Sequence, residues 1–261
     1  MAEKFSKPQG YERYLGPWSA ALARPFLDFA GVKDGDRVLD VGSGTGSLAC
    51  ALATTRPRSE VVGIDPSAPY VQFAVTRIKD SRVRFQVGDA MNLPYVNSSF
   101  DKSLAQLVVS SIPDPFRAAL EMRRVTKSGG TLAACVWASG KDNERNWMFW
   151  EAAMAVDPAA AEWCETGGRY GRTGGLVSLW TDCGLKEIEE SALVVSVEFG
   201  SFEDFWLPHL EGQGRAGSYV RSLPPDRQEA LRERLRRDLL GARPDGPFSL
   251  RAQAVAVRGI C

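Results

Sequence analysis

The chain has 261 residues, of which 44% are apolar and 25% are charged, and this composition is typical of a folded globular protein. Its 32 lysines and arginines balance 32 aspartates and glutamates, which argues against a nucleic-acid partner, because proteins that bind a phosphate backbone usually carry a basic excess. The N-terminal residues lack the apolar core of a signal peptide, and no apolar run approaches the roughly 18 residues of a membrane span. We therefore expect a cytoplasmic protein that has no membrane partner.

Cysteine and histidine content limits the chemistry further. The five cysteines are widely spaced and form no C-x-x-C pair, a pattern that favours reduced thiols over a disulfide framework. The chain has one histidine, His209, which excludes a histidine-rich metal site, and no bound metal is expected. A Ser-His-Asp triad would have to use this same residue.

Short apolar strands alternate with amphipathic helices along most of the chain. After an aromatic-rich arm and a short helix at residues 1–30, we expect strands at 37–41, 61–64, 83–87, 101–109, 131–137, within 185–199 and at 252–258, and helices at 45–54, 71–78, 116–125 and 176–184. Strands that alternate with helices predict a parallel α/β sheet covered on both faces, with right-handed crossovers.

Two stretches, 138–172 and 200–247, interrupt this alternation. The first is rich in Trp, Glu, Gly and Arg, and the second holds aromatic residues, glycines and an arginine-rich helix. Each is inserted near a strand end, where open α/β sheets bind ligands. We interpret both as cap insertions over an active site, within a single domain that spans residues 1–261.

A glycine loop follows the first predicted strand, in the segment VLDVGSGTG (38–46). Glycines let the backbone turn sharply and approach a ligand closely, and the helix that follows offers unpaired N–H groups. The loop alone is weak evidence, because dinucleotide-binding folds share it. However, Asp40 precedes the glycines, and its carboxylate would repel a pyrophosphate but attract the ammonium and sulfonium groups of S-adenosylmethionine (SAM).

Two further carboxylates stand at the next strand ends. Asp65 ends the second strand about 20 residues beyond the loop, where a carboxylate can accept hydrogen bonds from both ribose hydroxyls. Asp89 follows the third strand and could reach the exocyclic amine of an adenine. Alternatively, Asp40 and Asp65 cap helices and Asp89 caps a turn. Three carboxylates at successive strand ends beside one glycine loop favour a SAM site.

These motifs resemble class I SAM-dependent methyltransferases, in particular the branch of ubiquinone and menaquinone biosynthesis (methyltransferase domain 11/25). The matching segments are VLDVGSGTG (38–46), VVGIDPS (61–67), VGDAMNLPY (87–95), FDKSLAQLVVSSIPD (100–114) and RRVTKSGGTL (123–132). The resemblance covers approximately residues 10–200. It implies a Rossmann-like sheet of seven strands in the order 3-2-1-4-5-7-6, with the last strand antiparallel and helices on both faces.

The resemblance also implies which residues contact the cofactor. They are Tyr11 and Arg13 in the arm, Asp40, Gly42, Ser43 and Gly44 at the methionine half, Asp65, Pro66 and Ser67 at the ribose, Asp89 and Ala90 at the adenine, and Gln106 at the reaction centre. For the methionine carboxylate, either Tyr11 or Arg13 is the expected partner.

Residues that contact the methyl acceptor are harder to predict. Members of the family often carry a histidine a few residues after the position of Gln106, but this chain has Ser110 and Ser111 there. His209, within the predicted cap, is the remaining candidate for a catalytic base. Aromatic residues could line an apolar substrate pocket, although most such residues belong to a core. The candidates are Tyr14, Trp18, Trp147, Trp150 and Trp206.

The leading interpretation is an enzyme that transfers the methyl group of SAM to an O, N, S or C nucleophile of a small molecule by in-line displacement, leaving S-adenosylhomocysteine. A SAM-binding protein without transfer activity is the main alternative, because the cofactor motifs say nothing about the acceptor. An NAD-dependent oxidoreductase fits less well, because of Asp40 and the G-x-G-x-G spacing. Methylation of RNA or protein is disfavoured by the balanced charge. The sequence leaves open whether the protein is a monomer or a homodimer.

Overall fold

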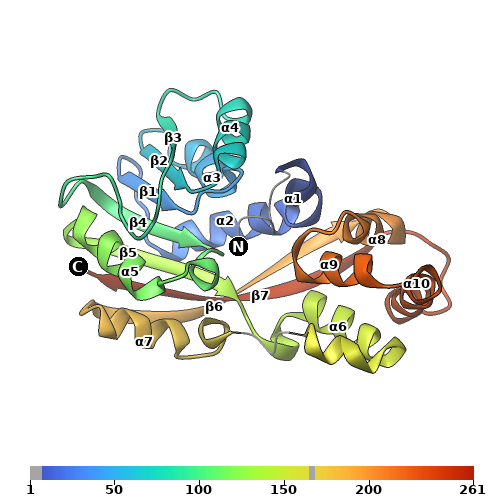
Figure 1. The fold of residues 1–261 in the computed structure, drawn as a ribbon. Helices are drawn as coiled ribbons and strands as arrows, with labels where there is room; N and C mark the ends of the chain where they lie inside the picture. Colours follow the sequence, from blue (N-terminus) through green and yellow to red (C-terminus); the bar gives the residue numbers. More distant parts are fainter. Residues whose placement is uncertain (1–7, 165–167) are drawn as a thin grey trace.

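A seven-stranded sheet forms the centre of the molecule in a computed structural model, which describes residues 8–164 and 168–261 (Figure 1). The strand order β3-β2-β1-β4-β5-β7-β6 confirms the predicted topology. β1 to β5 are parallel, and β7 runs antiparallel between β5 and β6. The strands are β1 (Arg37–Val41), β2 (Glu60–Asp65), β3 (Val83–Val87), β4 (Phe100–Gln106), β5 (Thr126–Trp137), β6 (Lys186–Phe199) and β7 (Phe248–Ile260).

Three strands differ from their predicted bounds, among them the fifth, which begins at Thr126 instead of residue 131. The fourth was expected to reach residue 109 but ends at Gln106, because Leu107 has a left-handed backbone (φ 61°) that no extended strand can hold. A short 3₁₀ helix, Val109–Ser111, follows it. The last strand is longer than the expected 252–258, because β7 pairs with β6 as far as the contact between Phe199 and Phe248.

The α-helices cover the sheet and its carboxyl edge. They are α1 (Pro8–Tyr14), α2 (Gly16–Phe29), α3 (Ser47–Thr55), α4 (Ala68–Arg77), α5 (Pro115–Val125), α6 (Glu144–Val156), α7 (Gly175–Asp182), α8 (Phe202–Leu210), α9 (Gly214–Ser222) and α10 (Pro225–Leu240). Among the described residues, no helix is long and apolar enough to cross a membrane.

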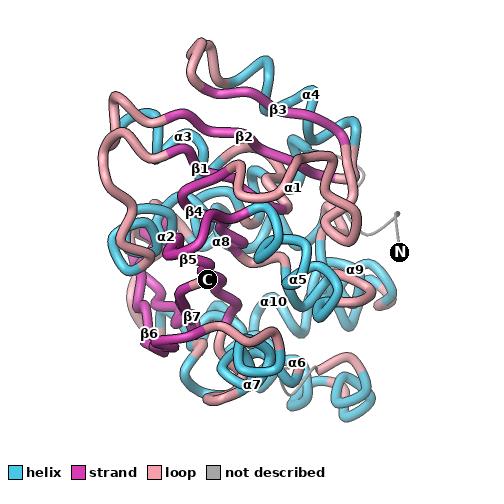
Figure 2. The backbone as a smooth tube through the Cα atoms, turned by 90° about the vertical axis from the view of Figure 1, so that its left-hand side faces the viewer, coloured by secondary structure: helices cyan, strands magenta, loops and turns pink. Residues whose placement is uncertain are grey.

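The core consists of two apolar layers on opposite faces of the sheet. Neighbouring residues of β1 show the division, since Val38 contributes to the layer beneath α2 and α3, whereas Leu39 contributes to the layer beneath α5 and α7. Figure 2 shows these helix pairs on the two sides of the strands. Because side chains of a strand alternate between its faces, a run of buried residues in each central strand supplies both layers.

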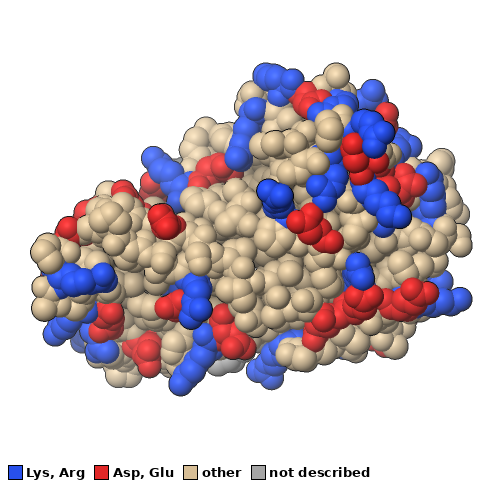
Figure 3. Space-filling model, turned by 180° about the vertical axis from the view of Figure 1, so that it is seen from behind, with Lys and Arg blue, Asp and Glu red and all other residues tan. Residues whose placement is uncertain are grey.

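The segments predicted as a cap form helices that gather at one end of β6 and β7 (Figure 1). There, α6 packs against α10, and α8 packs against α9. In α10, Leu231 and Leu235 are fully buried, while the arginines lie on the more exposed side and alternate with acidic residues. Positive and negative side chains are also interspersed over the face of the molecule in Figure 3.

Candidate active site

The glycine loop wraps around the end of β2. Backbone N–H groups of Gly42 and Ser43 both donate to the carbonyl of Ile64, at 2.8 and 3.1 Å. Gly42 has a left-handed backbone (φ 70°), and a Cβ added to it would lie 2.7 Å from Val108 Cβ and 2.9 Å from Val108 Cγ1. Both its conformation and its surroundings therefore require glycine at this position.

Asp65 braces this loop from the end of β2. Its two carboxylate oxygens accept hydrogen bonds from the backbone N–H groups of Gly44 and Ser67, each at 2.9 Å. Burial raises the pKa of Asp65, and the two hydrogen bonds act in the opposite direction. The carboxylate thus joins the glycine loop to the start of α4, and the predicted ribose contact of Asp65, Pro66 and Ser67 stays a prediction.

Asp40 has a different environment, although it lies only one strand away. It is 1% exposed, and its Oδ2 has no hydrogen-bond partner within the described chain. Burial, together with the nearby charge of Asp65, raises the pKa of Asp40 to about 7. A carboxylate held in this way gains most from a cationic ligand group beside it.

A narrow cavity of about 30 Å³ lies between the glycine loop and the N-terminal arm. Its lining includes six of the predicted cofactor residues, namely Tyr11, Asp40, Gly42, Ser43, Gly44 and Gln106. Four further lining residues were not predicted: Ser19, Thr45, Ser47 and Leu48. Thr45, Ser47 and Leu48 could have been inferred from the helix N-terminus that follows a glycine loop, but Ser19 carried no signal in the sequence.

Several polar atoms around this cavity are buried without a hydrogen-bond partner among the described residues. They are Asp40 Oδ2, Ser43 Oγ, Ser47 Oγ and Gln106 Oε1. Native proteins leave few such atoms unsatisfied, and a cluster of them is typical of a polar binding site. Gln106 is held in place because its Nε2 donates to the carbonyl of Ser19 at 2.9 Å, which leaves its Oε1 as the acceptor.

The cavity is closed on one side by α1 and the start of α2, which contribute Tyr11 and Ser19 to its lining. The Tyr11 ring lies 5.5 Å from the Tyr70 ring, and the Tyr11 and Ser19 hydroxyls are 3.3 Å apart. In contrast, Arg13 is largely exposed and forms an ion pair with Glu211 on the far side of the arm, at 2.8 Å. Of the two residues predicted for the methionine carboxylate, the structure therefore places only Tyr11 at the cavity.

Asp89 and Ala90 do not line the cavity. The Asp89 side chain is exposed, and its Oδ1 accepts a hydrogen bond from the backbone N–H of Met91 at 2.8 Å. This geometry is the turn cap that the sequence left open as an alternative. A contact between Asp89 and an adenine stays a prediction.

His209 lies in an aromatic cluster and does not line the cavity. Its ring stacks on Phe149 at 5.0 Å and meets the edge of Tyr14 at 5.1 Å, and the residue is 3% exposed. Burial and the positive charge of Arg145 lower the pKa of His209 to about 3. An imidazole with so acidic a conjugate acid is a weak general base at neutral pH, so its surroundings do not favour the predicted catalytic role.

The buried His209 should make folding stability depend on pH. Between pH 6.5 and 3 the unfolded chain binds a proton at this residue and the native chain does not, so stability is lost as pH falls. We expect wild type to lose about 2 kcal/mol more than His209→Gln between pH 7 and pH 5. Urea unfolding of both proteins across this range measures the difference between their free energies of unfolding. The other titrating groups are common to both proteins, so their contributions cancel. Parallel curves would show that His209 is protonated in the native state.

The tryptophans predicted to touch substrate are mostly part of the core. Trp18, Trp150 and Trp206 are only 2 to 3% exposed, and Trp147 is half-buried beside Lys141. Tyr14 and Trp18 do come together in space, because their rings flank the guanidinium of Arg145 at 4.6 and 5.4 Å. The sequence did not single out Arg145 within the segment 138–172.

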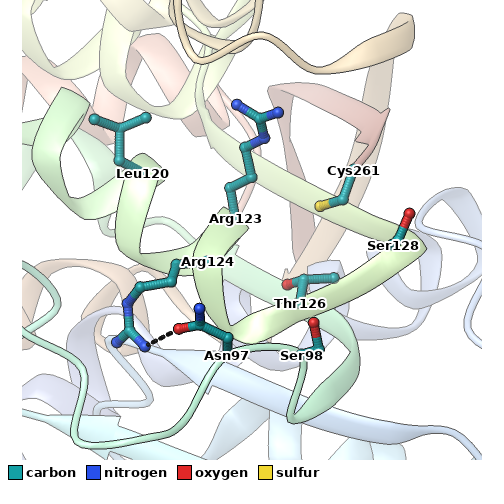
Figure 4. Close-up of a pocket in the computed structure, with 8 residues that line it drawn as sticks. All are labelled: Asn97, Ser98, Leu120, Arg123, Arg124, Thr126, Ser128 and Cys261. Carbon is teal, nitrogen blue, oxygen red and sulfur yellow. Dashed lines mark hydrogen bonds between the residues drawn. The ribbon is translucent and has the colours of Figure 1, made fainter.

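A wider hollow of about 410 Å³ lies at the opposite edge of the sheet, at the amino ends of β4 and β5 (Figure 4). Its basic groups have structural roles, since Arg124 donates to Asn97 Oδ1 at 3.0 Å and pairs with Glu121 at 2.8 Å, and Arg123 donates to the carbonyl of Cys183. The hollow is lined by Asn97, Ser98, Leu120, Arg123, Arg124, Thr126, Ser128 and Cys261, and none of these residues was predicted to bind a cofactor. The candidate site is therefore the small cavity at the carboxyl edge.

Comparisons with known proteins show what this segment of the chain is similar to. Residues 39–134 match the family model described as a methyltransferase domain. A demethylmenaquinone methyltransferase of Roseiflexus sp. is 30% identical over 134 residues, which cover 48% of this chain and 56% of that protein. A ubiquinone/menaquinone biosynthesis C-methyltransferase of Geobacter sp. is 32% identical over 107 residues, covering 39% and 46%. The chain thus spans about half the length of the curated relatives that it matches.

Solved structures share the fold over nearly the whole chain. A candidate methyltransferase from an antibiotic biosynthesis pathway of Anabaena variabilis superimposes with a TM-score of 0.63 at 18% identity, covering 92% of this chain and 96% of that one. The YcgJ protein of Bacillus subtilis gives a TM-score of 0.57 at 20% identity, covering 93% and 97%. Residues 39–134 therefore resemble the methyltransferase domains of ubiquinone and menaquinone biosynthesis, and the chain as a whole shares its fold with these solved structures.

Proposed function

We propose that the protein binds SAM at the glycine loop and transfers its methyl group to a small-molecule acceptor, leaving S-adenosylhomocysteine. The observation that carries this proposal is the cluster of buried, unpartnered polar atoms beside the loop, on Asp40, Ser43, Ser47 and Gln106. Such a cluster is costly in an empty protein interior and is relieved by a ligand with complementary groups.

The chemistry of these groups fits the methionine half of SAM. The Asp40 carboxylate and Gln106 Oε1 are acceptors for an ammonium group. The Ser43 and Ser47 hydroxyls, together with the first turn of α3, supply donors for a carboxylate. Both charged ends of the amino acid moiety therefore have partners of the right kind.

Entry of SAM requires the N-terminal arm to move. The cavity has a volume of about 30 Å³, which is about the volume that one water molecule occupies in the liquid. It is far too small for a nucleoside. Tyr11 and Ser19 close it, and the arm is held by ion pairs of Glu12 with Arg77 and of Arg13 with Glu211. These pairs are partly exposed, and exposed pairs contribute only about 0–1 kcal/mol each, so the arm can open at modest cost.

Bound SAM would supply an electrophilic methyl group on a positively charged sulfur. The contribution of the chain is then to position the acceptor and exclude water, since an in-line displacement needs alignment more than acid or base assistance. Gln106, fixed by Ser19, orients the methionine portion, and the closing arm with Tyr11 shields the reaction from solvent. No residue is assigned as a general base.

Calorimetric titration with SAM, S-adenosylhomocysteine and NADH tests the proposal. We expect micromolar binding of the first two ligands and none of NADH. Asp40→Asn should weaken SAM binding at least tenfold at pH 7.5, because a charge-assisted hydrogen bond contributes about 1.5–3 kcal/mol. Asp182→Asn, which changes an exposed carboxylate on α7, is the matched control and should bind as wild type does.

The same experiment separates the alternatives. Binding of NADH alone would overturn the assignment of the site. A transfer assay with SAM labelled on the methyl group then follows the label in a cell extract. Label in the small-molecule fraction supports the proposed reaction, label in protein or RNA contradicts the small-molecule acceptor, and tight SAM binding with no transfer indicates a SAM-binding protein without enzymatic activity.

A further inference from the structure

Arg145 is a buried cation that makes no hydrogen bond or ion pair within residues 8–164 and 168–261. It is the second residue of α6 and is 9% exposed. Its guanidinium contacts only the rings of Tyr14, at 4.6 Å, and Trp18, at 5.4 Å. Its five N–H donors have no acceptor among these residues, although the nitrogens keep slight contact with solvent.

Such an arrangement is costly without a further partner. An arginine does not lose its proton in a protein, so burial does not neutralise it. The desolvation penalty for a buried ion is several kcal/mol, while cation–π contacts return about 2 kcal/mol in a desolvated site. The two aromatic rings offset part of the cost, and an anion would offset the rest.

The position of Arg145 is next to the proposed SAM cavity. Trp18, whose ring the guanidinium contacts, is followed in sequence by Ser19, whose carbonyl accepts a hydrogen bond from Gln106 at 2.9 Å. Trp18 also contacts Trp137, the last residue of β5, at 6.4 Å. Arg145 thus lies at the carboxyl edge of the sheet, where folds of this kind bind their ligands. The N-terminus of α6, capped by Asn143, adds a positive field at the same place.

The surroundings indicate what kind of anion fits. Glu144, the preceding residue, pairs with Arg251, and Glu211, two positions after His209, pairs with Arg13. The groups around the guanidinium are Tyr14, Trp18 and the uncharged His209 ring, so a single positive charge stands among aromatic side chains. One cation matches a monoanion, and planar guanidinium pairs with carboxylate through two parallel hydrogen bonds.

We propose that Arg145 binds the carboxylate of the methyl acceptor, and that this acceptor is an aromatic carboxylic acid whose ring packs beside Tyr14 and Trp18. The inference rests on the proposed methyltransferase function, because it locates the acceptor relative to the SAM cavity. Arg145 then sets substrate specificity, and the atom that receives the methyl group lies elsewhere on the acceptor.

Benzoate and benzamide are suitable probes, because they share a ring and differ in charge. They and inorganic phosphate are titrated into protein saturated with S-adenosylhomocysteine. Benzoate is expected to bind at least tenfold more tightly than benzamide and more tightly than phosphate. Arg145→Met should abolish the preference for benzoate over benzamide, whereas Arg24→Met, which removes an exposed arginine of α2, should preserve it.

Titration of every variant with S-adenosylhomocysteine comes first, so that two failures can be told apart. If the cofactor product binds wild type, equal affinities for benzoate and benzamide, a preference that survives in Arg145→Met, or tighter binding of phosphate would each overturn the Arg145 assignment and leave the methyltransferase intact. If it does not bind wild type, the proposed function fails, and the acceptor assignment fails with it.

A second variant guards against misfolding of Arg145→Met. Arg145→Lys keeps the charge but lacks the forked donor geometry. It should bind S-adenosylhomocysteine within twofold of wild type and lose several-fold in benzoate affinity. Unchanged benzoate affinity in Arg145→Lys, with normal binding of the cofactor product, would contradict a bidentate carboxylate contact.

Discussion

Gly42→Ala should lower the free energy of unfolding by about 2–5 kcal/mol and abolish SAM binding. A left-handed backbone costs a non-glycine residue about 1–2 kcal/mol, and overpacking of a closed site adds typically 1–3 kcal/mol. Both terms apply here, because Gly42 has φ 70° and an added Cβ would collide with the Val108 side chain. Urea unfolding gives the stability, and calorimetry gives SAM affinity.

Two further variants separate the terms. Gly129→Ala is the matched control, because Gly129 also has a left-handed backbone (φ 76°) but has no heavy atom within 4 Å of an added Cβ. It should lose only about 1–2 kcal/mol and retain SAM binding. Combining Gly42→Ala with Val108→Ala should restore part of the lost stability, and only part, since Val108 Cβ itself would lie 2.7 Å away. Equal losses in Gly42→Ala and Gly129→Ala would show that the loop adapts and that the contact with Val108 is unimportant.

SAM affinity should rise with pH by up to about fiftyfold between pH 5 and pH 7. The pKa of Asp40 is raised to about 7, so below that pH the carboxyl group is protonated in the free protein. A bound ammonium group stabilises the ionised form, and binding at low pH must therefore release a proton. Above pH 7 the affinity should level off, and it should fall again once the α-amino group of the ligand loses its proton near pH 8.

Asp40→Asn provides the test, because the asparagine side chain has the same shape as that of aspartate but does not ionise. Its SAM affinity should be low and independent of pH between 5 and 7. Calorimetry in two buffers of different ionisation enthalpy counts the proton released by wild type at pH 6, where we expect close to one per SAM bound. A wild-type affinity that does not change across this range, or no proton release, would place the ammonium group away from Asp40.

Those parts of the site that depend on local sequence were predictable. Asp40 and the glycines follow one another within a single strand-to-helix turn, so their spacing alone predicts that they lie close together, and they do line one cavity. The strand order likewise follows from a family pattern that is spread over short motifs. Asp89 shows the limit of this approach, because a carboxylate after a strand serves equally well to cap its own turn.

The rest of the site depends on contacts between distant segments. Ser19 reaches the cavity because α2 packs beside β4, where its carbonyl meets Gln106 across 87 positions of sequence. The position of Arg145 depends on its contacts with Tyr14 and Trp18, more than a hundred residues earlier in the sequence. No periodicity or motif in the segment 138–172 distinguishes it from the exposed arginines nearby. Contacts between distant segments are determined by how the whole core packs, and they leave no pattern in the local sequence.

The glycine loop depends on β2 for its shape. Its backbone N–H groups at Gly42 and Ser43 donate to the carbonyl of Ile64, and that of Gly44 donates to the Asp65 carboxylate. Each of the three amides is held by β2, so the loop acquires its shape only after β2 has docked on β1. Their exchange with solvent hydrogen should consequently be no faster than the opening of that strand pair. The glycine loop therefore belongs to the same cooperative unit as the centre of the sheet, and its shape is fixed whenever that strand pair is intact.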